Sequence, residues 1–194
     1  MQKLTREQLM PLEEYHLQRS DFRRTVMSHK ELRQIAIGPH ATLYFEDRLT
    51  VQYQVQEMLR VERIFEAGAI QEELDAYNPL IPDGNNWKAT FMIEYEDADE
   101  RQIALTKLVG VEDKVWARVG EAAVVWAIAD EDLERSRAEK TSAVHFLRFQ
   151  FTDEMVHAAQ AGAGLGIGID HPAYNYRIDA LSAAARAGLV ADFG

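Results

Sequence analysis

The segment TSAVHFLRFQF, residues 141–151, is the strongest β-strand pattern in the chain, because its alternate residues are apolar and share one face. Thr152 follows this segment and is a suitable N-cap for a helix that we expect to end near Ala161. The apolar segment LGIGI, residues 165–169, then predicts another strand. Together these segments predict a strand–helix–strand unit over residues 142–169.

A second strand–helix–strand unit is predicted earlier in the chain, over residues 88–119. It begins with KATFMIEYE, in which Ala89, Phe91, Ile93 and Tyr95 face one way. A helix capped at its start by Asp97 and a strand KVWARV complete the unit. The two units share few identical residues, so we interpret them as a structural duplication of split-βαβ type and not as a sequence repeat.

The remaining segments predict the α+β fold class, with mostly antiparallel sheet in a β-rich part over residues 86–180. KVWARV and AVVWAI flank Gly120 and Glu121, which favours a hairpin between them. The alternating glycines of LGIGI do not match a phosphate-binding fingerprint, since they enter a strand instead of opening a helix. They indicate close packing or a sheet edge. The alanine-rich segment LSAAARAGLVADF predicts a terminal helix.

The first 80 residues predict a mainly helical part with a short β hairpin. Thr5 and Gln8 fit a capping box for a short helix, and a second helix is expected over residues 21–31. The extended segments RQIAI and ATLYF are separated by Gly38. A helix is predicted over 49–67; it is mostly apolar, so we expect it to pack against the sheet. A shorter helix is predicted over 70–77. The loop NPLIPDGNN follows and separates this part from the β-rich part. We expect residues 1–194 to form a single domain.

The composition excludes several classes of protein. A formal net charge of -11 and a pI of about 5.0 argue against nucleic acid as a partner. The chain has no cysteine, which removes disulfides, thiol nucleophiles and cysteine-held metal clusters. The N-terminus lacks the apolar core of a signal peptide, and no apolar run approaches the roughly 20 residues of a membrane span. We therefore expect a cytoplasmic protein that does not enter a membrane.

The helix TVQYQVQEMLRVERIF, residues 50–65, carries Glu57 and Glu62 among apolar residues. Its predicted solvent face consists of the side chains Gln52, Gln56, Arg60 and Arg63. An unpaired buried carboxylate is costly, so each glutamate is paired with arginine, bound to a metal, protonated or exposed. The two lie about 140° apart round the helix and cannot chelate one ion from it. Glu57 is the better site candidate, since it lies nearer the polar face.

The histidines provide further candidate ligands. His16, His29 and His157 lie in charged or mixed helical segments and are expected on the surface, whereas His145 is expected to be a core residue with its hydrogen bonds satisfied. His40 and His171 lie beside prolines at strand ends, where loops display functional groups. Asp170 precedes His171 and could act with it as a base or metal ligand if a turn brought the two side chains together. The alternative is that both histidines form turn-stabilising hydrogen bonds.

Three long segments of the chain closely resemble a known family. They are GPHATLYFEDRLTVQYQVQEMLRVERIFEAGAIQEELDAYNPLIPDG, IADEDLERSRAEKTSAVHFLRF and GIDHPAY. The chain resembles the domain of unknown function 3501 family of bacterial proteins. Members are often encoded beside a rubrerythrin-like protein and an iron–sulfur, heterodisulfide-reductase-like protein. The resemblance therefore implies an accessory role in redox or iron metabolism, with partners of those two kinds.

Two hypotheses for function remain open, and the sequence does not decide whether the protein is an enzyme. The first is an accessory or binding protein without a cofactor of its own, working with redox partners. The second is a metal-dependent enzyme or metal-binding protein that holds divalent iron, manganese or zinc. Its expected ligands are His40, Glu57, Glu62, Asp170 and His171. A homodimer is the default expectation for the assembly.

Overall fold

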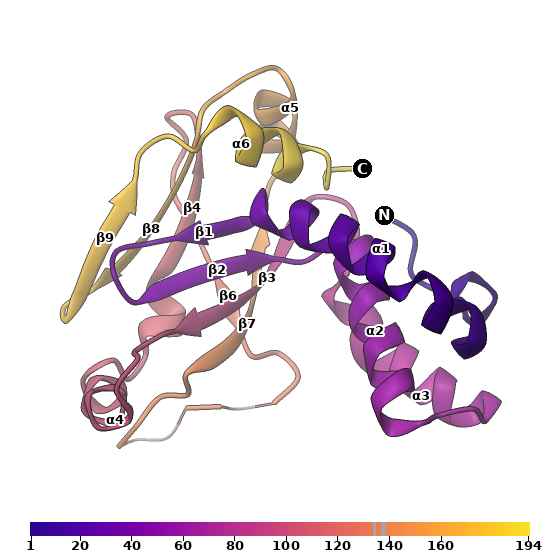
Figure 1. Cartoon of the computed structure of the whole chain (residues 1–194). Helices are drawn as coiled ribbons and strands as arrows, with labels where there is room; N and C mark the ends of the chain where they lie inside the picture. Colours follow the sequence, from indigo (N-terminus) through magenta and orange to yellow (C-terminus); the bar gives the residue numbers. More distant parts are fainter. Residues whose placement is uncertain (134, 137–138) are drawn as a thin grey trace.

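The computed structural model describes residues 1–133, 135–136 and 139–194 (Figure 1). Over these residues the chain forms six α-helices and two antiparallel sheets, which confirms the predicted α+β fold class. Three positions of the family-like segment 128–149, namely 134, 137 and 138, lie outside the described residues. Within the described ranges, no helix combines the length and the apolar character needed to cross a membrane.

The β strands divide into two separate sheets. The first sheet has the strand order β1 (Gln34–Ala36), β2 (Ala41–Phe45), β3 (Asn86–Ile93), β7 (Val144–Gln150) and β6 (Ile128–Ala129). The second has the order β5 (Val125–Trp126), β4 (Val115–Val119), β8 (Leu165–His171) and β9 (Tyr174–Ile178). All neighbouring strands are antiparallel, as predicted.

One hydrophobic core takes side chains from both sheets. The alternation predicted for β3 is confirmed, because Ala89, Phe91 and Ile93 are buried in this core. Ala117 and Ile167 reach it from the second sheet. Three helices add to the same core: α4 (Ala98–Lys107), α5 (Asp153–Gln160) and α6 (Ala183–Val190). The residues that alternate with the buried ones on β3 face the opposite side of the first sheet and form its outer face.

Both predicted strand–helix–strand units are present, but they are not of split-βαβ type. Each unit begins in the first sheet and ends in the second: one runs from β3 through α4 (Ala98–Lys107) to β4, the other from β7 through α5 to β8. β3 pairs with β7, and β4 pairs with β8. A split βαβ unit would place parallel strands in one sheet, so that interpretation is wrong.

The hairpin at Gly120 is confirmed, because Trp116 on β4 lies opposite Trp126 on β5. Gly120 has φ +54, which glycine adopts without strain. AVVWAI divides between the sheets, since β5 belongs to the second and β6 to the first. The glycines of β8 serve close packing, as predicted: a Cβ added at Gly168 would collide with the Trp116 indole.

The N-terminal part is mainly helical and lies beside one end of the first sheet (Figure 1). Its helices are η1 (Arg6–Gln8), α1 (Leu12–Glu31), α2 (Arg48–Glu62), α3 (Ala67–Tyr77) and η2 (Asn78–Leu80). Outside this part, the short helix η3 (Val111–Lys114) precedes β4. The capping box at Thr5 is confirmed. The helix predicted over 21–31 is the second half of the longer α1. A separate small core joins α2, α3 and the N-terminus through residues such as Val55, Leu74 and Leu4.

The helix predicted over 49–67 is shorter than expected. Asp47 caps its start by accepting a hydrogen bond from the Thr50 backbone N–H. Arg63 has φ +55 in the left-handed region, and the Ile64 N–H donates to the Leu59 carbonyl, which ends α2. Gly68 therefore lies in the first turn of α3 and does not end α2.

The predicted solvent face of α2 is also partly wrong. Gln56 is fully buried, because its side-chain amide exchanges two hydrogen bonds with the backbone of Met10. The apolar residues Val61 and Phe65, in contrast, are 58% and 63% exposed. The N-terminal segment before α1 crosses α2 at Gln56 and covers a face that the sequence pattern assigned to water.

Candidate functional site

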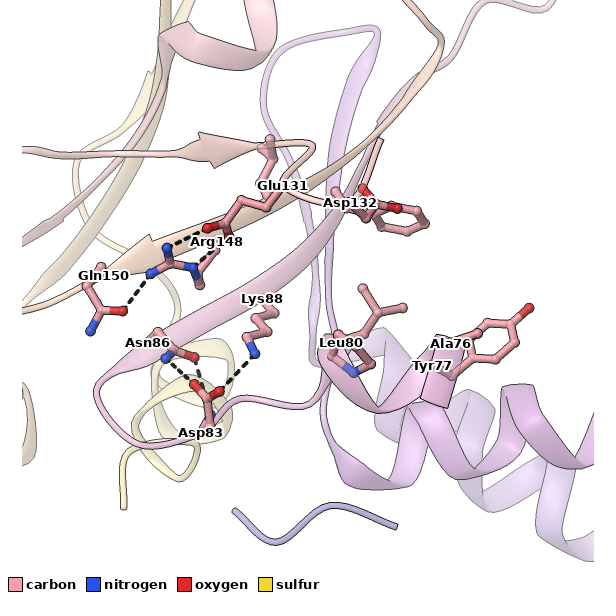
Figure 2. A pocket seen from close by; sticks show the side chains of 13 residues that line it. Ala76, Tyr77, Leu80, Asp83, Asn86, Lys88, Glu131, Asp132, Arg148 and Gln150 are labelled. Carbon is pink, nitrogen blue, oxygen red and sulfur yellow. Dashed lines mark hydrogen bonds and ion pairs between the residues drawn. The ribbon is translucent and has the colours of Figure 1, made fainter. Parts of the chain in front are cut away.

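A cleft of about 700 Å³ lies between the end of α3 with η2 and the outer face of the first sheet (Figure 2). One wall comes from the mainly helical part and the loop NPLIPDGNN, and the floor comes from β3 and β7. The lining residues are Ala76, Tyr77, Pro79, Leu80, Asp83, Asn86, Lys88, Glu131, Asp132, Phe146, Leu147, Arg148 and Gln150. The cleft therefore lies where the two predicted parts of the chain meet.

Two cations lie side by side in the floor of the cleft. Lys88 on β3 and Arg148 on β7 are direct cross-strand partners in the antiparallel pair. Directly opposed residues of such a pair project from the same face, so both side chains leave the outer face of the sheet. Asn86 and Gln150 form the next pair on that face. The alternation that buries Trp87 and Ala89 thus places these polar groups in the cleft.

Lys88 is held at the edge of the loop NPLIPDGNN. Its ammonium donates a hydrogen bond to the Ile81 carbonyl at 3.1 Å. It donates a second to the Asp83 carboxylate at 3.3 Å (Figure 2). Burial raises the pKa of Asp83, but the hydrogen bond from Asn86 and the charge of Lys88 outweigh this effect. The net pKa of Asp83 therefore lies below its ordinary value, and the carboxylate is ionised at neutral pH.

Arg148 forms a two-point ion pair with Glu131. Its Nε and Nη2 each donate to a Glu131 oxygen at 2.7 Å, and Nη1 donates to the Gln150 Oε1 at 2.7 Å (Figure 2). The hydrogen bonds from Arg148 lower the pKa of Glu131 despite partial burial. Every cation in the floor thus has a carboxylate partner from a loop.

The wall opposite the floor is mostly apolar. Ala76 and Tyr77 come from the end of α3, and Pro79 and Leu80 come from η2. On the floor, Phe146 of β7 lies on the same face as Arg148 and adds an aromatic ring, with the Arg135 guanidinium 4.5 Å from the ring centroid. The cleft therefore offers an apolar surface on one side and fixed charges on the other.

Glu57 is engaged by α1 and α2. Its carboxylate accepts hydrogen bonds from Arg19 at 2.7 and 2.8 Å, from the Tyr15 hydroxyl at 2.7 Å and from Arg60. The pairing with arginine that the sequence left open is therefore confirmed for Glu57, with Arg19 of α1 as its two-point partner. Glu62 is exposed near the end of α2. The two glutamates therefore lie in different environments, one in an ion-pair cluster and the other in solvent.

The Glu57 cluster predicts a specific pH dependence. The hydrogen bond from Arg19, against an opposing effect of burial, lowers the pKa of Glu57 from 4.5 to about 2. A lowered pKa contributes stability that is present above pH 4.5 and is lost as the pH falls toward 2. We expect Glu57→Gln to lower the free energy of unfolding at pH 7 by about 1 kcal/mol, and by less at pH 3, in urea titrations.

The exposed Glu62→Gln variant is the matched control on the same helix. It is expected to unfold like the unmodified protein at both pH values. Equal losses for Glu57→Gln at pH 7 and pH 3 would contradict this account of Glu57.

His40 lies at the start of β2. Its Nδ1 is 3.1 Å from the Glu94 carbonyl, and its ring stacks on Tyr95 with 3.9 Å between the centroids. Its backbone N–H donates to the Tyr174 hydroxyl at 2.9 Å. Since Tyr174 is the cross-strand partner of His171, this tyrosine links the surroundings of the two histidines.

Asp170 and His171 point in opposite directions, as expected for neighbours in a strand. Asp170 is exposed and accepts a hydrogen bond from Asn175. His171 is nearly buried: its Nε2 lies 3.2 Å from the Val109 carbonyl, and its Nδ1 accepts from the Ala173 N–H. Across the residues that the structure describes, no three His, Asp or Glu side chains gather as metal ligands. The hypothesis of a metal site at these residues stays a prediction.

His145 is confirmed as a core residue with its hydrogen bonds satisfied. It is fully buried, with Nδ1 at 2.6 Å from an Asp130 carboxylate oxygen and Nε2 at 2.9 Å from the Thr141 hydroxyl. The Glu112 carboxylate accepts from Thr141 and lies 3.8 Å from Nε2. Asp130 has φ +51 and directly precedes Glu131 of the cleft. The histidine thus holds the base of the loop that borders the cleft.

A second buried polar cluster surrounds Arg33. Its guanidinium lies 2.5 Å from Asp192 and 3.5 Å from Asp47. His29 was expected on the surface, but it is half-buried, and its Nε2 lies 2.5 Å from Asp47. Burial raises the pKa of Asp192 to about 6, against the opposing charge of Arg33. This cluster ties the C-terminal segment to the start of α2.

Sequence reasoning missed the cleft residues Lys88, Arg148, Asp83 and Glu131. The available signal was that both cations lie at outward positions of strongly predicted strands. The signal could not bring them together, because the register of β3 against β7 is not visible in the sequence.

These features define an α+β protein with two antiparallel sheets and a mixed apolar and charged cleft. The chain belongs to the family described as Protein of unknown function (DUF3501), whose model matches residues 3–193, so the resemblance seen in the sequence is confirmed. A crystal structure of a novel protein of unknown function from Burkholderia pseudomallei is similar, with 50% identity, a TM-score of 0.94 and 100% of each chain covered. No curated protein matches the chain.

Proposed function

We propose that this protein is an accessory protein that binds a small organic ligand in the cleft between α3 and the first sheet. The observation that carries the proposal is the pairing of an apolar wall with a floor of fixed polar groups. Ligand sites in proteins are concave, are lined mainly by apolar residues with a few polar groups, and measure about 300–1,000 Å³. The cleft, at about 700 Å³, falls within this range.

Filling the cleft tests the proposal. Ala76 is exposed near the end of α3 and lines the cleft, so Ala76→Trp would place an indole in the cleft without changing the core. Gln71→Trp, at an exposed position of the same helix, is the matched control. We expect small aromatic fragments to shift the NMR signals of cleft residues in the unmodified protein and in Gln71→Trp, with at least a tenfold loss of affinity in Ala76→Trp.

Fragments that bind equally well to both variants would place their site elsewhere and overturn the proposal. A fragment set that leaves the cleft signals unchanged in the unmodified protein would overturn it as well.

The redox setting of this function rests on the family resemblance, and we keep it as part of the proposal. The proposed partners are iron–sulfur and rubrerythrin-like proteins. A pull-down from native cells that returns neither kind would count against them. Metal analysis of protein purified without chelator tests the alternative of bound iron, manganese or zinc.

A further inference from the structure

We infer that the cleft ligand carries an oxyanion, a carboxylate or a phosphate, which is held between Lys88 and Arg148 while an apolar body lies against the opposite wall. This inference rests on the proposed function and names the chemistry of its ligand. Its basis is the placement and burial of five charged side chains: Lys88, Arg148, Asp83, Glu131 and Asp132.

The first observation is the direct opposition of two cations. Lys88 and Arg148 face each other across β3 and β7 on the outer face of the sheet. Directly opposed like charges destabilise an antiparallel pair, so the position requires negative charge beside them. A planar guanidinium next to an ammonium matches the two oxygens of a carboxylate or the several oxygens of a phosphate.

The second observation is the difference in burial between the cations and their partners. The side chains of Lys88 and Arg148 are 11% and 24% exposed, whereas those of Asp83 and Glu131 are 49% and 50% exposed. The cations project from strands, and the carboxylates come from loops. The cations are thus fixed features of the floor, and the carboxylates lie at its rim, in contact with water.

The third observation concerns what an entering anion must replace. An ion pair whose carboxylate is half-exposed contributes little to stability, because water competes for that carboxylate. A ligand oxyanion can therefore exchange with Glu131 on Arg148 while that carboxylate turns to water. Asp132 does not compete for Arg148, because it pairs with Arg135 at 2.6 Å. The protein's own Glu131 and Asp83 act as internal competitors of the ligand.

The experiment compares four probes with the same aromatic body: benzoate, phenyl phosphate, benzyl alcohol and benzylamine. NMR titrations of the full chain are expected to show benzoate and phenyl phosphate binding at least about fivefold more tightly than the alcohol or the amine. Arg148→Gln is expected to weaken the two anions on the order of tenfold and to change the alcohol less than twofold.

Glu131→Gln gives the decisive measurement, because it removes a half-exposed competitor and leaves both cations in place. It is expected to strengthen the binding of benzoate and phenyl phosphate roughly two- to fivefold. A purely structural ion pair predicts no such gain. Should Arg148→Gln fail to fold, the Glu131→Gln result decides alone.

Two kinds of failure are distinguishable. In the first, the alcohol or the amine binds as tightly as the anions, and Ala76→Trp abolishes this binding. That result would overturn the inference of an oxyanion and leave the proposed function intact. If Glu131→Gln left the affinity for the anions unchanged or weakened it, the inference of an oxyanion would also be overturned. If no probe perturbs the cleft, the proposed function falls, and this inference falls with it.

Discussion

Replacement of Arg33 by methionine is expected to lower the free energy of unfolding by about 3–5 kcal/mol, because it leaves a buried carboxylate without its partner. Arg33 is 2% exposed, and its guanidinium donates to three carbonyls, those of Phe45, Glu46 and Gly188, besides Asp192. Each of these acceptors would lose a hydrogen bond inside the protein. Urea titration monitored by circular dichroism measures the loss.

The control for this prediction is Arg24→Met on α1, where the side chain is 74% exposed and its ion pair with Asp21 is solvated. A change within about 0.5 kcal/mol is expected there. Adding Asp192→Leu to Arg33→Met is expected to recover part of the loss, since it removes the unpaired charge. Equal effects of Arg33→Met and Arg24→Met would refute the role given to Arg33.

The loss caused by Arg33→Met is also expected to depend on pH. Burial already raises the pKa of Asp192 to about 6, and the charge of Arg33 opposes that rise. A raised pKa contributes stability that is present at low pH and is lost as the pH increases through the folded value. Without Arg33 the pKa rises further, so the penalty is expected to be larger at pH 8 than at pH 5.

Replacement of His145 by leucine is expected to cost about 3 kcal/mol, the second largest effect. Leucine fits the apolar side of the strand, but it removes the hydrogen bonds that join the ring to Asp130 and Thr141. The Asp130 carboxylate keeps the Phe146 N–H and Arg135, so the loss stays below that at Arg33. Thermal and urea unfolding of the purified variant measure it.

His16→Leu is the matched control, since His16 is exposed on α1. Because Asp130 adjoins Glu131 in the chain, His145→Leu is also expected to shift the NMR signal of the Arg148 side chain in the folded protein. A His145→Leu variant as stable as His16→Leu, with an unchanged Arg148 signal, would show that the buried network does not hold the loop.

The strands and their faces were predictable because alternation is a local property of the sequence. KATFMIEYE displays its buried face directly, and the same reasoning assigned His145 to the core. The helix boundaries were less accurate, since Arg63 adopts a left-handed conformation that its residue type does not announce. Gln56 was misplaced for a different reason: its burial depends on the backbone of Met10, which approaches from another segment.

The cleft and the buried clusters could not be predicted, because each joins residues from distant segments. Arg33 meets Asp192 only after the C-terminal segment has packed near α2. Lys88 meets Arg148 only through the register of two strands. The five ligands singled out in the sequence were chosen from local context, which carries no information on such meetings.

The crossing of both strand–helix–strand units between the sheets has a consequence for the growing chain on the ribosome. When β3 and β4 have emerged, β3 still lacks its partner β7 and β4 still lacks its partner β8, because these two strands are made later. The edge of β3 that pairs with β7 therefore stays exposed while about fifty further residues are synthesised. Such unfinished surfaces invite association between nascent chains. Each sheet takes strands from both halves of the chain, so neither half alone can complete either sheet.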